Sequence, residues 1–324
     1  TDPEAEHGRV SGFIVGNEIQ AHWWWYNLGR MPPGAVIRDY AKALRTASLA
    51  VRKVHRGLRV YVSMDHHWTA AMDPDQEKFI PGKLLLDELS ALVRREGDFP
   101  WGVAFHPYPE NLLDPRTWND VHAQRSLDAE KITFRNIEVL VAYLRREPLL
   151  FEGRQRQLIL SEQGFHCPDG PDGEKLQAAG YAYAYHRVRA AGGIDAFILH
   201  RHADHPHEGG LHLGIRAAGA GSGTKRFLHD VFRLADTPAW ESAFDFAKPL
   251  IGIRDWSEVL PSSAPIAESR TAPACTASAS SSLAGHEPPG AVDGNRFACG
   301  PGSAWKGAAG EAAWWWEASF PEPR

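Results

Sequence analysis

Two glutamates each end an apolar run, in positions where a core residue or a helix-face charge is not expected. Glu18 follows the apolar residues 13–15 and the Gly16-Asn17 break, and Glu162 closes the run "LILSE". Glycoside hydrolases use two carboxyl groups that face each other across the substrate. One donates a proton to the leaving oxygen, and the other attacks the anomeric carbon. A lone glutamate at such a position is usually a solvated loop charge, so the pair carries the interpretation.

The elements that must position these glutamates alternate between strand and helix from residue 10 to about residue 235. Strand-like runs cover residues 10–19, 59–66, 101–107, 157–165 and 196–202. Helix-like runs cover residues 35–54, 82–95, 134–146, 174–191 and 224–234. Near-continuous apolar strands are typical of a parallel sheet covered by helices. The sequence therefore predicts an α/β fold of five βα units.

Polar residues follow all five predicted strands, at the edge where α/β proteins place their function. Besides the two glutamates, they are Asn17, Asp65, His66, His67, Trp68, His106, Tyr108, His200, Arg201, His202, Asp204 and His205. For a single histidine a structural role is the more common one. Polar residues at the carboxyl ends of all five predicted strands, however, predict a single cleft that these residues line. Trp23, Trp24 and Trp25 follow Glu18, and their default role is packing. Sugar rings present apolar C–H faces that stack on such side chains, so Trp23 and Trp24 are candidates for substrate binding.

The composition narrows the function classes. The 324 residues are 43% hydrophobic and 23% charged, with a net charge of −5 and no basic block, which argues against nucleic acid and anionic membrane surfaces. No apolar run approaches the roughly 20 residues of a membrane span. The three cysteines fit no zinc spacing, although Cys275 and Cys299 could pair in an exported protein. The chain starts at Thr1, so a lost N-terminus would hide a signal peptide.

Three short motifs carry a family resemblance. "GNE", "HPY" and "SEQGF", in this order, resemble the clan GH-A glycoside hydrolases, which are (β/α)8 TIM barrels. The resemblance implies Glu18 as acid/base on strand 4, Asn17 as partner of the substrate 2-hydroxyl, and Glu162 as nucleophile on strand 7. It also implies Tyr108 as the hydrogen-bonding neighbour of Glu162, with His106 lining the site. The clan often has a tryptophan at the end of strand 8, where this chain has "LHRHADH".

Because the resemblance places Glu18 at the end of strand 4, the sequence is predicted to be a fragment of a longer barrel protein. Residues 1–260 would be a partial TIM barrel with strands 4–8 present and strands 1–3 missing, followed by a linker at 261–270. Residues 271–324, with "ASASSS", "AVDGN", "SAWKG" and "AWWWEASF", resemble the truncated start of a discoidin-like carbohydrate-binding β-sandwich.

The leading hypothesis is a retaining glycoside hydrolase that acts on a polysaccharide or glycan, without metal or cofactor, and that is secreted, at the cell surface or periplasmic. Its predicted substrate contacts are Asn17, Trp23, Trp24, His66, Trp68, His106, Tyr108, His200, Arg201 and His202. Arg201 and the histidines around it suggest a charged or substituted sugar. One alternative is a metal-dependent amidohydrolase-type barrel with His66, His106, His202 and Asp204 as ligands. Another is a non-catalytic glycan-binding protein. The sequence specifies neither the sugar and its linkage, nor endo or exo action, nor the oligomeric state.

Overall fold

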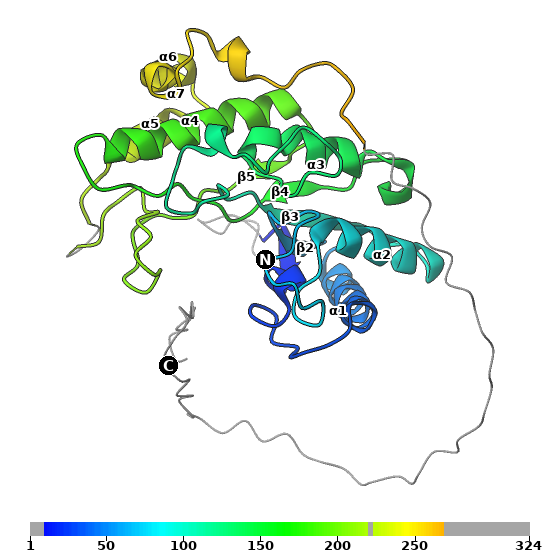
Figure 1. Ribbon diagram of the computed structural model, residues 1–324. Helices are drawn as coiled ribbons and strands as arrows, with labels where there is room; N and C mark the ends of the chain where they lie inside the picture. The colour runs from blue at the N-terminus through cyan, green and yellow to red at the C-terminus, as the bar shows by residue number, and fades with distance from the viewer. Residues whose placement is uncertain (1–9, 220–222, 269–324) are drawn as a thin grey trace, which may run out of the picture. The chain divides into compact units, whose positions relative to one another are not determined.

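The computed structural model describes residues 10–219 and 223–268, which contain one parallel sheet (Figure 1). Its strands are β1 (Gly12–Val15), β2 (Arg59–Asp65), β3 (Trp101–His106), β4 (Leu158–Leu160) and β5 (Ala196–Phe197). They lie in chain order, and each pairs in parallel with the next. The prediction of an α/β fold with a parallel sheet is confirmed.

A helix follows each strand. These helices are α1 (Pro33–Val54), α2 (Gly82–Arg95), α3 (Ile137–Leu144), α4 (Gly173–Ala191) and α5 (Phe227–Leu234). The predicted helix 134–146 divides into the 3-10 turn η3 (Phe134–Asn136) and α3, because the Thr133 side chain caps η3 and accepts a hydrogen bond from the Arg135 N–H. Two short helices, α6 (Trp240–Phe244) and α7 (Lys248–Ile251), come after α5.

The remaining short elements are 3-10 turns in the connections. They are η1 (Ile19–Ala21), η2 (Thr117–Asn119), η4 (Glu147–Leu149), η5 (Asp245–Ala247) and η6 (Trp256–Val259). Among them, η1 matters most for the site, because it begins directly after Glu18 and all three of its residues are buried.

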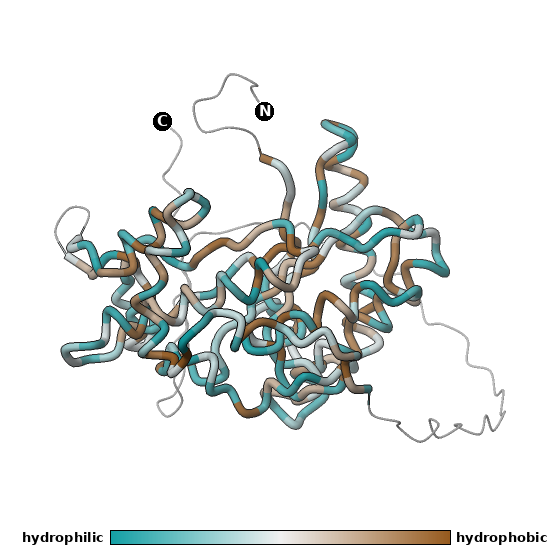
Figure 2. The backbone as a smooth tube through the Cα atoms, turned by 90° about the horizontal axis from the view of Figure 1, so that it is seen from above, coloured by the Kyte–Doolittle hydropathy of each residue, from teal (hydrophilic) through white to brown (hydrophobic). Residues whose placement is uncertain are grey.

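The core lies between the sheet and its helices. Every residue of β2 and β3 except Arg59 is buried, and Val60, Val62 and Val103 belong to one cluster with Leu44 of α1 and Leu85 of α2. Figure 2 shows hydrophobic segments in the interior of the unit and hydrophilic segments in its outer loops. This packing fixes the strands, and with them the residues at their carboxyl ends.

On the opposite face of the sheet, the ring of Tyr61 occupies space that two neighbouring glycines leave free. A Cβ atom on Gly12 or Gly102 would lie 2.6 Å from the ring of Tyr61, so only glycine leaves room for this ring. The Tyr61 hydroxyl donates a hydrogen bond of 2.9 Å to Gln157 Oε1. Tyr61 therefore lies across β1 and β3 and links β2 to the start of β4.

In the described residues the sheet is open, with β1 and β5 as its two edges. Phe13 and Ile14 on β1 are each 44% exposed, and Ile198 beside β5 is 50% exposed. Closure into a (β/α)8 barrel therefore stays a prediction. No helix of residues 10–219 and 223–268 is long and apolar enough to cross a bilayer.

The chain divides into two units, residues 1–269 and residues 270–324, and every described residue belongs to the first. Residues 262–267 of the predicted linker are part of this first unit and bond to its earlier residues. Arg125 donates hydrogen bonds to the carbonyl oxygens of Ser262 and Pro265, and the Leu127 N–H donates one to Ala267. The predicted discoidin-like module lies outside the described residues, as do Cys275 and Cys299.

Candidate active site

Glu18 stands just beyond β1 in an unusual backbone conformation. Its φ of 38° is in the left-handed region, which a non-glycine residue seldom adopts, and Gly16 before it has a φ of 76°. The Glu18 N–H donates a hydrogen bond of 2.9 Å to the Ser63 hydroxyl of β2. Such strain persists only where the surroundings hold it, and it concentrates at functional positions.

The turn after Glu18 is fixed to β2 through a single buried side chain. Gln20 accepts a hydrogen bond of 2.6 Å from the Asp65 N–H and donates one of 2.7 Å to the His67 carbonyl oxygen. Gln20 is fully buried, so the ends of β1 and β2 are held together where β2 gives way to the "DHHW" stretch. This network explains how a residue at an edge strand keeps a defined position.

His106, the last residue of β3, lies between the two glutamates. Its Nδ1 atom is 2.9 Å from Glu18 Oε1 and 3.9 Å from Glu162 Oε2, and its Nε2 atom is 3.1 Å from the Ser161 hydroxyl. One carboxylate oxygen of Glu18, one of Glu162 and one ring nitrogen of His106 all lie within 4.8 Å of one another. The ends of β1, β3 and β4 thus meet at one point.

The three side chains differ in their access to solvent. The side chain of His106 is 2% exposed, that of Glu18 14% and that of Glu162 28%. The Tyr108 hydroxyl donates a hydrogen bond of 3.2 Å to Glu162 Oε1. Glu162 is therefore the more accessible carboxylate, and it is oriented by a neutral donor.

The surroundings shift the pKa values of this group. Burial raises the pKa of Glu18, the nearby carboxylates of Asp65 and Glu162 add to this, and His106 opposes it. Burial alone would lower the pKa of His106, but its hydrogen bond to Glu18 and the charges of Glu18 and Glu162 raise it overall. Burial, and next the charge of Glu162, hold the pKa of Tyr108 well above its usual value. A proton is thus retained on the Glu18–His106 pair at higher pH than either group would hold it alone in water.

Other predicted site residues lie elsewhere or have other partners. Trp68 is fully buried, donates its indole N–H to the Leu127 carbonyl oxygen and packs edge-on against Tyr143, which are the contacts of a core residue. His66 is buried, and burial together with His67 lowers its pKa to about 3, so the ring is neutral. Asn17 is exposed, with a long contact of 3.5 Å to the Ser63 hydroxyl.

The end of β5 forms a separate polar group. Glu208 contacts both the His200 ring, at 3.0 Å, and the Arg201 guanidinium. The His200 N–H donates a hydrogen bond of 2.8 Å to the Gln163 carbonyl oxygen, which places this loop beside the strand end that carries Glu162. His202 is exposed.

The predicted amidohydrolase ligands are not brought together. Asp204 is paired with Arg226 and lies 3.3 Å from His212. Within residues 10–219 and 223–268, the group with three donor atoms close enough to share one metal ion is Glu18, His106 and Glu162.

Several residues of the site were not predicted. Ser63 contacts Glu18, and Ser161 contacts His106. Gln20 fixes the turn after Glu18, and Glu208 contacts His200 and Arg201 in the loop after β5. Ser63 lies inside an apolar strand, where only the register of β1 against β2 reveals its role. Ser161, which directly precedes Glu162 in "SEQGF", could have been found from its position.

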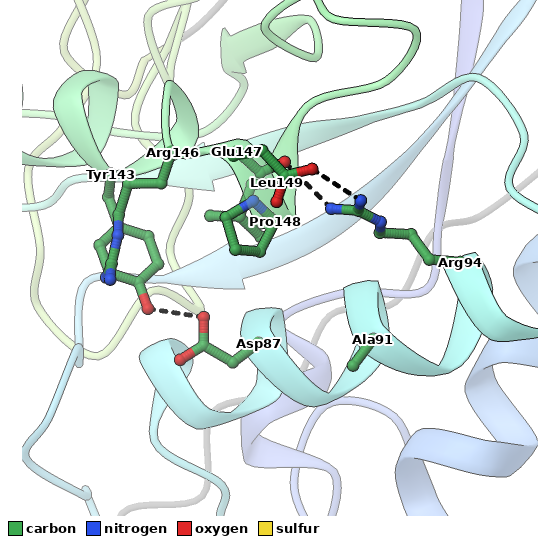
Figure 3. A pocket seen from close by; sticks show the side chains of 8 residues that line it. All are labelled: Asp87, Ala91, Arg94, Tyr143, Arg146, Glu147, Pro148 and Leu149. Carbon is green, nitrogen blue, oxygen red and sulfur yellow. Dashed lines mark hydrogen bonds and ion pairs between the residues drawn. The ribbon is translucent and has the colours of Figure 1, made fainter.

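A cavity of about 450 Å³ lies away from this group, on the helical side (Figure 3). It is lined by residues of α2 and by the segment from Tyr143 to Leu149, with Tyr143 bonded to Asp87 and Arg94 paired with Glu147. None of the predicted site residues lines it, so the carboxylate pair and not this cavity is the candidate active site.

Comparisons with known proteins give one family match. The model of DUF5722, described as a family of unknown function, matches residues 2–259. No curated protein matches the chain. Among solved structures, a family 39 glycoside hydrolase from the gut symbiont Bacteroides cellulosilyticus WH2 is similar over 66% of this chain and 45% of its own, with 12% identity and a TM-score of 0.35. This chain therefore spans less than half the length of that protein.

Proposed function

We propose that this chain, which belongs to the family of unknown function DUF5722, is a retaining glycoside hydrolase. The observation that carries the proposal is the approach of Glu18 and Glu162, whose nearest oxygens lie within 4.8 Å. Retaining glycosidases hold their two carboxyl groups about 5–5.5 Å apart, whereas inverting enzymes need about 6.5–9.5 Å to seat a water between them. The approach of one oxygen of each carboxylate to within 4.8 Å supports the shorter arrangement, in which one carboxylate attacks directly.

Glu18 is the proposed acid/base. Burial raises its pKa, as the acid of a glycosidase requires, because the group must carry a proton that it can give to the leaving oxygen. After the leaving group departs, the ionised Glu18 accepts a proton from the water that attacks the glycosyl-enzyme. His106, in contact with Glu18, is a positioning residue that stabilises this ionised form.

Glu162 is the proposed nucleophile. It is the more exposed of the two carboxylates, so a sugar can reach it, and the Tyr108 hydroxyl fixes one of its oxygens. In the first step Glu162 forms a bond to the anomeric carbon while the bond to the leaving oxygen breaks. In the second step water replaces Glu162, and the anomeric configuration is retained.

The proposed substrate is an O-glycosidic bond of a polysaccharide or glycan, and this chemistry requires no organic cofactor or metal. A polysaccharide substrate also supports a location outside the cytoplasm, as the sequence interpretation proposes. Asn17, next to Glu18 and exposed, is the proposed partner of the substrate 2-hydroxyl.

The test traps the covalent intermediate. A panel of 4-nitrophenyl glycosides identifies a cleaved sugar, and the matching 2-deoxy-2-fluoro glycoside with a good leaving group then inactivates the protein. We expect mass spectrometry to place the added sugar on the peptide that contains Glu162. The Glu162→Ala variant should be inactive, and azide should restore turnover with an inverted glycosyl azide as product. A label on another peptide, or full activity of Glu162→Ala, would refute the assignment.

A second candidate, a metal-dependent hydrolase, rests on the same three donors, since Glu18, His106 and Glu162 could share one ion. The two candidates differ in their response to chelation. Glycosidase activity should survive dialysis against EDTA unchanged, whereas a metal-dependent hydrolase would lose activity and regain it on addition of Zn²⁺ or Mn²⁺.

A further inference from the structure

Two tryptophans directly after Glu18 are exposed, which is unusual for so large an apolar side chain. Trp23 is 41% exposed and Trp24 is 39% exposed, whereas each of the other six tryptophans in residues 10–219 and 223–268 is buried or half-buried. Met72, in the loop after β2, is also 44% exposed. Large exposed apolar side chains next to the candidate site make this turn a candidate binding surface.

The backbone around these indoles is held in place. The Ala21 N–H donates to the Glu18 carbonyl oxygen at 2.8 Å, and the Trp24 N–H donates to Ala21 at 2.9 Å. The neighbouring loop supports the same segment. The Trp23 N–H donates a hydrogen bond to the Lys78 carbonyl oxygen, and the His22 ring contacts the Glu77 carbonyl oxygen. The indoles are therefore presented by an ordered turn that starts at Glu18.

The surroundings of Trp23 suit a sugar ring. Trp23 is the second residue after η1, the turn that begins directly after Glu18. The Lys78 ammonium group lies 5.7 Å from the centre of the Trp23 ring, which places a hydrogen-bond donor next to the apolar surface. Flat aromatic area beside a polar donor matches the alternating C–H and hydroxyl faces of a sugar.

The position of the indoles relative to the two carboxylates identifies which sugar they would bind. Glu162 follows β4, three strands away, while both tryptophans lie in the loop after β1, and the Trp23 N–H bonds to Lys78 in the loop after β2. The nucleophile bonds the sugar that stays on the enzyme, and the acid protonates the oxygen of the part that leaves. A substrate whose retained sugar lies at Glu162 would extend past Glu18 toward the loop after β1, which carries both tryptophans.

We propose that Trp23 and Trp24 form a leaving-group subsite, so that the substrate is a glycan chain with at least one further sugar ring beyond the cleaved bond. This inference rests on the proposed function and adds the side on which the chain extends. Binding energy gained there from a remote sugar would raise kcat/KM for chains above that for simple glycosides.

The test compares two substrates that share the sugar bound by the nucleophile. One is the glycosyl fluoride of the sugar that the wild-type protein cleaves, whose leaving group has no ring to stack on an indole, and the other is a tetrasaccharide of the same sugar. We expect Trp23→Ala and Trp24→Ala each to lower kcat/KM for the tetrasaccharide about tenfold, and for the fluoride less than about threefold. Trp24→Tyr, which keeps a flat ring, should recover most of the loss. Phe232→Ala, an exposed aromatic on α5, is the matched control and should change neither value.

Binding without turnover gives a second readout. In a Glu162→Ala background, the tetrasaccharide should change tryptophan fluorescence, and Trp24→Ala should weaken this binding about tenfold. Equal losses on both substrates, or no loss on either, would overturn the subsite and leave the proposed function intact. A wild-type protein that cleaves no glycoside and binds no tetrasaccharide would refute both.

Discussion

The side chain of His106 touches both proposed catalytic carboxylates, so replacing it tests how they are tuned. His106→Gln retains a hydrogen-bond donor of similar reach but removes the positive charge. The ring is 2% exposed and lies 2.9 Å from Glu18, so solvent screens the interaction little. The variant therefore separates the contribution of charge from that of shape.

The expected loss follows from the strength of the bond. A hydrogen bond to a charged group contributes about 1.5–3 kcal/mol, and a neutral one about 0.5–1.5 kcal/mol. The difference of about 1–1.5 kcal/mol corresponds to a five- to tenfold fall in kcat/KM at the pH optimum. The assay is hydrolysis of the 4-nitrophenyl glycoside found in the substrate panel.

The pH profile gives the sharper result. Burial raises the pKa of Glu18, and His106 holds that rise in check, so removing the imidazole raises the pKa of Glu18 further. An acid must be protonated to act, and activity falls as pH rises through its pKa. We expect the high-pH limb of the kcat/KM profile to move to higher pH in His106→Gln. Ser161→Ala, which removes only the contact at Nε2, is the control and should move this limb less. A limb that stays in place or moves to lower pH would refute the tuning role.

Three further predictions concern neighbouring residues. Tyr108→Phe removes one donor to Glu162 at 3.2 Å, so kcat/KM should fall about tenfold with little change in thermal stability. The fold lowers the pKa of His66 from the ordinary 6.5 to about 3, so below pH 6.5 the imidazole takes up a proton in the unfolded chain but not in the folded one. The free energy of unfolding should therefore fall by at most about 1.4 kcal/mol per pH unit as the pH is lowered. Urea unfolding at pH 7, 5 and 4 measures this dependence, which should be weaker in His66→Gln. Trp68→Ala should cost about 3–5 kcal/mol of unfolding free energy, since this indole is fully buried, and an unaltered melting temperature would contradict its core role.

The periodicity of the sequence predicted the elements well where packing follows local pattern. The predicted helix at 82–95 coincides with α2, and all five strands and their order along the chain are present. The strands themselves are shorter than predicted. The run at 157–165 yields three residues of β4, because from Ser161 onward the chain turns into the loop that carries Glu162. Apolar character continues past the end of a ladder, so it cannot mark where pairing stops.

The site could be predicted only as far as short motifs reach. Glu18, Glu162 and Tyr108 lie in such motifs, and the structure brings them to one edge. The contacts of Ser63 and Gln20 depend on the register between β1 and β2 and on a left-handed φ at Glu18, neither of which is encoded locally. Residues whose role comes from partners about 45 positions away leave no local signal.

The tryptophans show why burial at a strand end cannot be predicted from residue type. Trp68 and Trp24 both follow a strand and a polar residue, and both were predicted to bind sugar. Trp68 enters the core because the loop at 127–130 covers it and supplies a carbonyl acceptor for its N–H. Trp24 follows a buried 3-10 turn at the first strand of the described sheet, where the next helix, α1, begins only at Pro33. Coverage by a distant loop, a tertiary property, decides which indole packs and which remains available to a ligand.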